Sequence, residues 1–82
     1  MDKILVSIYV LTIDETYDIY IPINKKAKEA LDLVQKEIVK LSNDNYVINE
    51  KAMLYTENGT VINTNNMVRF SGLKNGQKLL LV

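Results

Sequence analysis

Apolar residues alternate with polar or mixed residues in two runs near the start of the chain. In the first run every even position from Ile4 to Val10 is a β-branched aliphatic residue, whereas the odd positions are mixed. This alternation is typical of a strand with one buried face, so we expect the even positions in the core and the odd positions on an outer face. The second run, Tyr17–Ile21, places Ile19 and Ile21 together on one side.

Two features at the ends of these runs predict a β-hairpin. The short polar segment Asp14–Thr16 lies between them, and Pro22 follows the second run. Two alternating runs joined by a short polar loop are the usual sequence pattern of a hairpin. Because proline has no N–H to donate to a strand ladder, we expect the second strand to end at Pro22.

One segment in the middle of the chain has the spacing of an α-helix, because its apolar residues fall on a single helix face. These residues are Ala27, Ala30, Leu31, Val34, Ile38 and Leu41. Asn24 is the candidate N-cap, since its side-chain oxygen could accept a hydrogen bond from a free N–H of the first turn. The polar segment Ser42–Asn45 is expected to end the helix.

The rest of the chain contains three further short runs with strand character. They are Ala52–Tyr55, Thr60–Ile62 and Gln77–Val82. Asn58-Gly59 and Asn75-Gly76 are tight-turn signals, because both residue types tolerate a positive φ. Between the turns, Met67–Phe70 supplies apolar side chains that we expect to plug the core.

The order of these elements restricts the topology. One helix must cover one face of a mixed sheet, and the right-handed crossover rule places the strand after the helix near the first strand. A hairpin, a helix across it and a C-terminal strand returning beside the first strand form the β-grasp arrangement. We therefore predict an α+β protein in which one helix packs across a mixed sheet of four to five strands, as a single domain of residues 1–82.

The composition argues against an enzyme or a metalloprotein. The chain has no cysteine and no histidine, so thiolate chemistry and the commonest general base and metal ligand are missing. Asp14 with Glu15, and Glu50 with Glu57, are better explained as solvated loop charges. The formal net charge is zero, which disfavours nucleic-acid binding. We expect no enzymatic activity, no cofactor and no metal.

The apolar run Ile4–Ile13 is the one segment that could suggest a leader peptide. It has no small-residue cleavage site, and it is shorter than the roughly 20 residues that a membrane-spanning helix needs. Its β-branched residues favour a buried strand instead. We therefore expect a cytoplasmic protein.

Two segments of the chain resemble a known family. Thr16–Pro22 contains a Tyr-Asp-aliphatic-x-aliphatic-Pro pattern, and Gly72–Val82 contains Leu-x-Asn-Gly-x-x-Leu. Both patterns resemble the YukD/EsaB group of bacterial ubiquitin-like proteins, and the resemblance covers essentially the whole chain. It implies a ubiquitin-like fold and an accessory, non-catalytic role in the type VII (WXG100/ESX-like) secretion systems of Gram-positive bacteria. It also implies a protein partner in the secretion machine, with peripheral attachment at the inner face of the membrane through that partner.

The chain ends at Val82 within the last predicted strand and carries no Gly-Gly tail. Covalent modifiers and sulfur carriers of the ubiquitin-like class use such a tail, so we expect that this protein is not conjugated. A covalent modifier or sulfur-carrier relative is therefore the less favoured alternative. A β-grasp scaffold or adaptor domain of the Ras-binding or PB1-like type is the other.

The outer face of the predicted sheet is the candidate interaction surface, because large exposed apolar clusters usually mark binding sites. Strand alternation assigns six residues to it: Leu5, Tyr9, Leu11, Leu54, Leu80 and Val82. Leu54, Leu80 and Val82 resemble the apolar recognition patch of ubiquitin in position. A homodimer through the same face is the alternative to a foreign protein partner.

Overall fold

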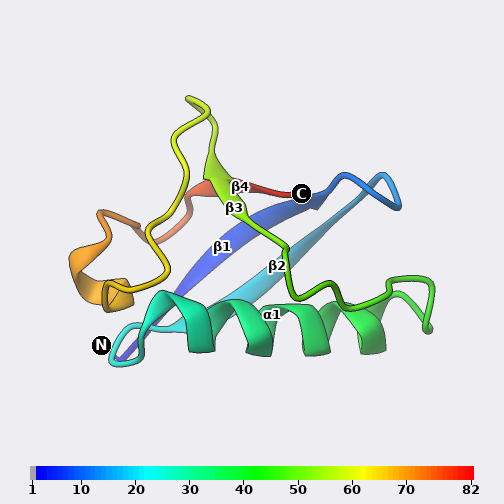
Figure 1. Ribbon diagram of the computed structural model, residues 1–82, viewed down its shortest axis with the longest axis horizontal. Helices are drawn as coiled ribbons and strands as arrows, with labels where there is room; N and C mark the ends of the chain where they lie inside the picture. The colour runs from blue at the N-terminus through cyan, green and yellow to red at the C-terminus, as the bar shows by residue number, and fades with distance from the viewer. Residues whose placement is uncertain (1) are drawn as a thin grey trace.

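The two runs at the start of the chain form the predicted hairpin in a computed structural model that describes residues 2–82 (Figure 1). β1 (Lys3–Val10) pairs antiparallel with β2 (Glu15–Pro22) along their full lengths. The even residues of β1 are buried and the odd residues between Leu5 and Tyr9 are partly exposed, as the alternation predicts. Pro22 is the last residue of β2.

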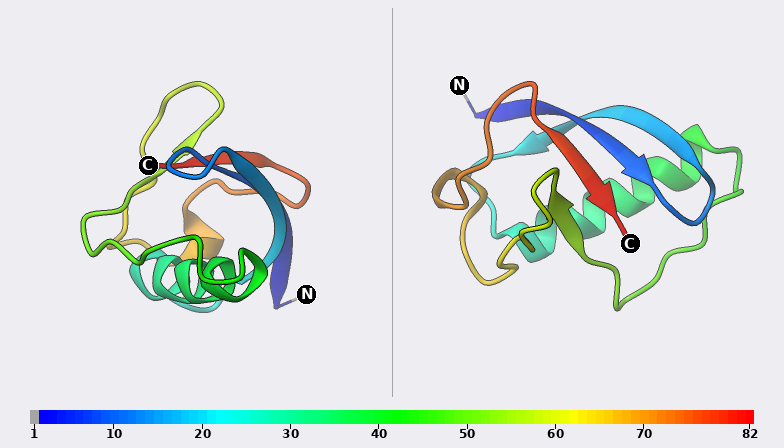
Figure 2. Two further views of the ribbon diagram at one scale, coloured as in Figure 1. Left: turned by 90° about the vertical axis from the view of Figure 1, so that its right-hand side faces the viewer. Right: turned by 90° about the horizontal axis from the view of Figure 1, so that it is seen from above.

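Two short strands complete the sheet, and one helix packs on it. They are α1 (Ala27–Leu41), β3 (Leu54–Thr56) and β4 (Lys78–Leu81), with a 3-10 helix η1 (Val68–Phe70) before β4. β4 pairs parallel with β1 and antiparallel with β3, giving the order β2-β1-β4-β3. α1 lies across one face of this sheet (Figure 2). The predicted β-grasp arrangement is confirmed, with four strands.

The segment Thr60–Ile62 does not form the additional strand that its sequence suggests. Val61 makes a single bridge with Tyr55, and the chain then turns away toward the start of α1. There the carbonyls of Asn66 and Thr64 accept the N–H groups of the first helical residues, Ala27 at 2.8 Å and Lys28 at 3.0 Å. Binding the helix end therefore takes precedence over continued strand pairing.

The same backbone contacts explain why the predicted N-cap at Asn24 is wrong. Lys26 holds the N-cap position and makes no side-chain capping hydrogen bond. The free N–H groups of a first turn need an acceptor, and backbone carbonyls of residues 64 and 66 provide it instead. At the other end, Asn43 and Asp44 adopt positive φ values of 52° and 67°, which ends the helix within the predicted segment.

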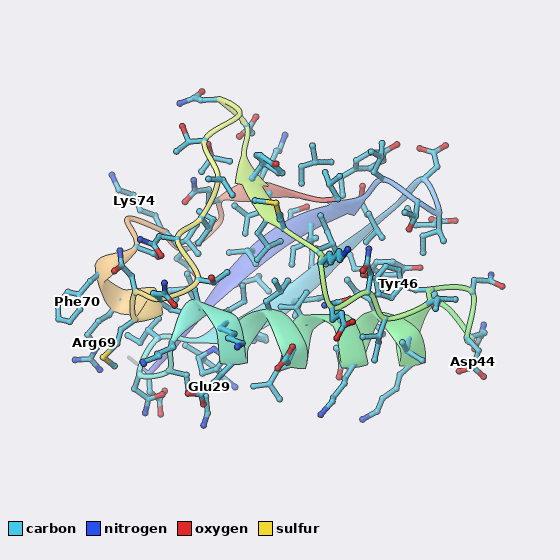
Figure 3. The ribbon with its side chains drawn as sticks, in the orientation of Figure 1. Glu29, Asp44, Tyr46, Arg69, Phe70 and Lys74 are labelled. Carbon is cyan, nitrogen blue, oxygen red and sulfur yellow. The ribbon has the colours of Figure 1, made fainter. Side chains whose placement is uncertain are left out.

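The core lies between α1 and the inner face of the sheet. Its most deeply buried aliphatic residues are Val6, Ile8, Val10, Ile21, Val34, Ile38, Val68 and Leu81. Two predictions about apolar residues are wrong. Leu41 is 47% exposed because it lies on the last turn of α1, and only Val68 of the segment Met67–Phe70 is fully buried. Phe70 is 72% exposed and projects away from the fold (Figure 3).

A buried polar side chain of α1 holds the loop of residues 42–53. Gln35 is only 2% exposed, and its Oε1 accepts a hydrogen bond from the Tyr46 hydroxyl at 2.7 Å and another from the Asn49 N–H at 2.8 Å. Tyr46 itself is buried between the loop and the C-terminal half of α1 (Figure 3). The loop is therefore fixed to the helix without regular secondary structure of its own. Among the described residues, none of the helices is long and apolar enough to cross a membrane.

Candidate interaction surface

Strand register brings apolar side chains together on the outer face of the sheet, opposite α1. Tyr9 of β1 lies beside Leu80 of β4, and Leu80 lies beside Tyr55 of β3. Residues in register on neighbouring strands have side chains on the same face, so these three form one continuous row. Each of the three side chains is partly exposed. Thr16 of β2 extends the row with a small polar side chain.

A second apolar row adjoins the first at the C-terminal ends of β1 and β4. Val82 and Met53 exchange two backbone hydrogen bonds of 3.0 Å, and the Leu11 N–H donates to the Leu81 carbonyl. The parallel register of β1 and β4, continued by one residue, places Leu11 beside Val82. Leu11, Val82 and Met53 are 51%, 44% and 41% exposed. We call the two rows together the outer patch: Tyr9, Leu11, Met53, Tyr55, Leu80 and Val82.

The remaining part of the outer face is polar, and it separates Leu5 from the outer patch. Ser7 pairs with Asp18 of β2 on one side and with Lys78 of β4 on the other. Leu5 lies beyond this polar row, where it pairs with the exposed Tyr20. Leu5 is thus on the predicted face but outside the apolar cluster.

The structure contradicts the assignment of Leu54 to the outer face. Leu54 is 5% exposed and pairs with the buried Leu81, so its side chain belongs to the core. Its neighbours Met53 and Tyr55 take the outer positions that the alternation had given to Leu54. The phase of this strand is set by its pairing with β4, because side chains of paired residues lie on the same face. Sequence analysis therefore missed Met53 and Tyr55 as surface residues.

The tyrosine of the first row has a fixed hydroxyl group. The Tyr9 hydroxyl donates a hydrogen bond of 2.5 Å to Oδ1 of Asp14, in the turn between β1 and β2. This hydrogen bond raises the pKa of Tyr9 above its ordinary value of 10.0, with smaller contributions from desolvation and from the Asp14 charge. The contact orients the ring at the rim of the outer patch. A tyrosine in this position offers both an apolar ring and a polar group to a binding partner.

No group of three or more Asp and Glu side chains within residues 2–82 is placed to hold a metal ion. Tyr46 is the other group with a raised pKa, and burial is the cause. Since its hydroxyl is engaged with Gln35 in the interior, this tyrosine has a structural role in the loop.

No protein-family model matches the sequence, and neither does any curated protein. Solved structures do match the fold. The ubiquitin-like domain of EccD5 from Mycobacterium xenopi superposes with a TM-score of 0.80 at 15% identity, covering 100% of this chain and 94% of that one. The chain has a ubiquitin-like β-grasp fold. The ubiquitin-like domain of the Mycobacterium tuberculosis type VII secretion system protein EccD1 gives a TM-score of 0.72 at 14% identity, covering 100% and 99%.

A ubiquitin-like fold also occurs within a larger chain of an ESX-5 inner membrane complex. That chain matches with a TM-score of 0.79 at 9% identity, and the alignment covers 100% of this chain but 21% of that one. At such low identities the comparisons establish a shared fold. They include ubiquitin-like domains of type VII secretion.

Proposed function

We propose that this chain is a non-catalytic interaction module that docks through the outer patch onto a protein component of a type VII secretion system. In this proposal residues 1–82 act as one domain, related to the YukD/EsaB group, in the cytoplasm of a Gram-positive bacterium. The partner holds it at the inner face of the membrane. The observation that carries the proposal is the two-row apolar cluster on the sheet face that α1 does not cover.

The composition of the outer patch supports protein binding. Aromatic residues and methionine are enriched in protein interfaces, and the patch contains two tyrosines and Met53. A rim of polar groups is also usual at interfaces, and here Ser7, Asp18 and Lys78 form one along the side of the patch. An apolar cluster of this kind on a small domain is otherwise a solubility liability, which favours a binding role.

The comparisons support the choice of partner class. The EccD1 domain is described as part of a type VII secretion system protein, and its fold extends over the full length of this chain. The resemblance of Thr16–Pro22 and Gly72–Val82 to the YukD/EsaB group points to the same kind of machine. Both likenesses are consistent with the same cellular setting for the outer patch.

A complementation experiment tests this proposal. The gene is deleted in its source bacterium and restored as the wild type or as the double variant Leu11→Asp/Val82→Asp, and secretion of a WXG100 substrate is measured. Both residues are well exposed, so we expect a folded variant whose secretion falls to the level of the deletion strain. The matched control is Val47→Asp/Ile48→Asp, which places the same charges at exposed apolar residues of the 42–53 loop.

A crosslinking measurement identifies what contacts the patch. A photoreactive amino acid at position 82 should attach the chain to a membrane component of the secretion system, whereas the same group at position 47 should not. Normal secretion by the folded Leu11→Asp/Val82→Asp variant would refute the proposal. Crosslinks at position 82 only to a second copy of the chain would replace the foreign partner with a homodimer.

A further inference from the structure

The two edges of the sheet differ in whether their backbone groups are already bonded. β3, at one edge, is three residues long. Its outward groups are used by the segment Thr60–Ile62: the Leu54 carbonyl accepts the Ile62 N–H at 2.8 Å. The Thr56 N–H likewise donates to the Thr60 carbonyl at 2.9 Å. β2, at the other edge, is eight residues long, and an edge strand of this length is a template for pairing with another chain.

The hydrogen-bond phase of the hairpin shows which groups of β2 point outward. The Ile23 N–H donates to the Asp2 carbonyl at 3.0 Å, so Ile23 and Asp2 are a hydrogen-bonded pair of the antiparallel ladder. Such pairs recur at every second residue, so Ile21 and every second residue before it in β2 also bond to β1. The residues in between direct their backbone N–H and C=O groups away from β1. These residues are Thr16, Asp18 and Tyr20. No hydrogen bond found outside the strand ladders in residues 2–82 uses their backbone groups.

A groove runs beside this free edge, between β2 and α1. It has a volume of about 380 Å³, and β2 contributes Ile19 and Tyr20 to its wall. The helix contributes Leu33, Glu37 and Leu41, which are spaced one turn apart along one stripe. Leu33 and Leu41 are 45% and 47% exposed, and Tyr20 is 59% exposed. An extended chain paired to β2 would direct every second side chain into this apolar groove.

The charges at the groove have a single sign. Asp18 and Glu37 line it, and no lysine or arginine is among its lining residues. Lys3 lies near this edge, and its ammonium group is 4.7 Å from the centre of the Tyr20 ring, where it makes a cation–π contact. An incoming strand that carries lysine or arginine would be attracted by this groove, and an acidic strand would be repelled.

The same charges disfavour self-association through β2. Antiparallel pairing of two β2 edges centred on Asp18 would place the Asp18 carboxylates of the two copies opposite each other. Like charges placed opposite one another across strands are destabilising. A foreign basic strand satisfies the free backbone groups without this repulsion, so it is the occupant that the charges select.

We propose that the β2 edge and its groove form a second binding site, which takes up a basic, extended peptide segment as an added strand. The backbone of the peptide bonds to the free groups of Asp18 and Tyr20. Its apolar side chains enter the groove against Leu33 and Leu41, and its lysine or arginine side chains face Asp18 and Glu37. This site lies at the edge of the sheet, and of its residues only Asp18 also belongs to the rim of the outer patch.

A peptide titration monitored by NMR tests the proposal. The probe is the capped hexapeptide Lys-Val-Lys-Val-Lys-Val, and Glu-Val-Glu-Val-Glu-Val is its control. We expect the basic peptide to bind at least about tenfold more tightly than the acidic one, and more weakly as salt is added. At saturation the amide protons of Asp18 and Tyr20 should exchange with solvent about tenfold more slowly, because they become hydrogen-bonded.

Charge and backbone variants separate the parts of the site. Asp18→Lys/Glu37→Lys should weaken binding of the basic peptide by about tenfold or more, whereas Asp32→Lys/Glu50→Lys changes the net charge equally at a distance and should not. Tyr20→Pro removes an N–H that makes no ladder bond, so the domain should stay folded while binding falls. Tyr20→Ala controls for loss of the ring.

The outcomes are distinguishable from those of the proposed function. Val82→Asp should leave peptide binding at β2 unchanged, since it alters only the outer patch. The second site is refuted if both peptides bind equally, if the basic peptide perturbs the outer patch instead of β2, or if the two charge variants bind alike. It is also refuted if the free chain forms dimers that protect the Asp18 amide.

Discussion

The two faces of β1 show how one strand serves both the core and the surface. Its even residues from Ile4 to Val10 are at most 8% exposed and pack beneath α1. The odd residues face outward, with Tyr9 at the rim of the outer patch. Neighbouring positions therefore have different roles. Substitutions one residue apart should affect stability in one case and surface properties in the other. The inner face determines whether the chain folds, and the outer face is the surface through which we propose that it binds.

The largest difference between the faces is expected at Leu54 and Met53. Leu54→Asp buries a carboxylate without a partner and should lower the free energy of unfolding by about 4 kcal/mol or more. Met53→Asp, at the adjacent exposed position, should change it by no more than about 0.5 kcal/mol. Urea unfolding followed by circular dichroism measures both. Equal losses in the two variants would contradict the opposite orientation of these side chains.

A smaller contrast is expected within and just beyond β1. Ile8 is fully buried, so Ile8→Ala should cost about 2–5 kcal/mol through lost contacts and the cavity left behind. Leu11→Ala, at a residue that is half exposed, should cost no more than about 0.5 kcal/mol. The same unfolding assay applies. Equal stability of the two alanine variants would contradict the placement of Ile8 in the core and Leu11 on the surface.

Gln35 extends the comparison to the polar part of the core. Gln35→Leu keeps the side-chain volume but leaves the Tyr46 hydroxyl and the Asn49 N–H without an acceptor, so it should cost about 1–3 kcal/mol. Tyr46→Phe removes one donor only and should cost about 0.5–1.5 kcal/mol. Because both variants break the same hydrogen bond, the double variant should cost less than the sum. Strict additivity would show that the loop is held by other contacts.

The smallest effect is expected at the Tyr9–Asp14 pair, which lies on the exposed face. The pKa of Tyr9 is raised above 10.0 in the folded chain, mainly by the hydrogen bond to Asp14. That contribution to stability is fully present below the unfolded pKa and is lost as the pH rises through the folded pKa. Asp14→Ala should therefore lower the Tyr9 pKa toward 10.0, as measured by NMR titration of labelled tyrosine. Glu15→Ala should leave the Tyr9 pKa raised. An unchanged Tyr9 pKa in Asp14→Ala would show that the Tyr9–Asp14 hydrogen bond is absent in solution.

Regular periodicity made the larger elements predictable. β1, β2 and α1 have clear periods over many residues, and each of them contains the residues that its pattern indicated. The run Ala52–Tyr55 is different, because it is short and apolar at nearly every position. Its phase depends on the pairing of Leu54 with Leu81, which no local pattern reveals. This is why one of the six predicted surface residues proved to be part of the core.

Features that depend on distant segments were not predictable from the sequence. Gln35 is buried only because Tyr46 and Asn49 bring donors to it across a loop. The β2 groove likewise needs α1 to lie beside a strand edge. Nothing in the residues of either segment alone marks a site. Such features become visible when burial and register are both known.

The parallel pairing of β1 with β4 has a consequence for how the chain is made. The Leu5 N–H bonds to the Asn75 side chain, 70 residues further along, and β4 fills the central place beside β1. A ribosome adds about 5–20 residues per second, so the stretch between α1 and β4 takes seconds to synthesise. During that interval the nascent hairpin has an open inner edge on its most apolar strand. Chaperone contact with the nascent chain should therefore end when β4 emerges and closes the sheet.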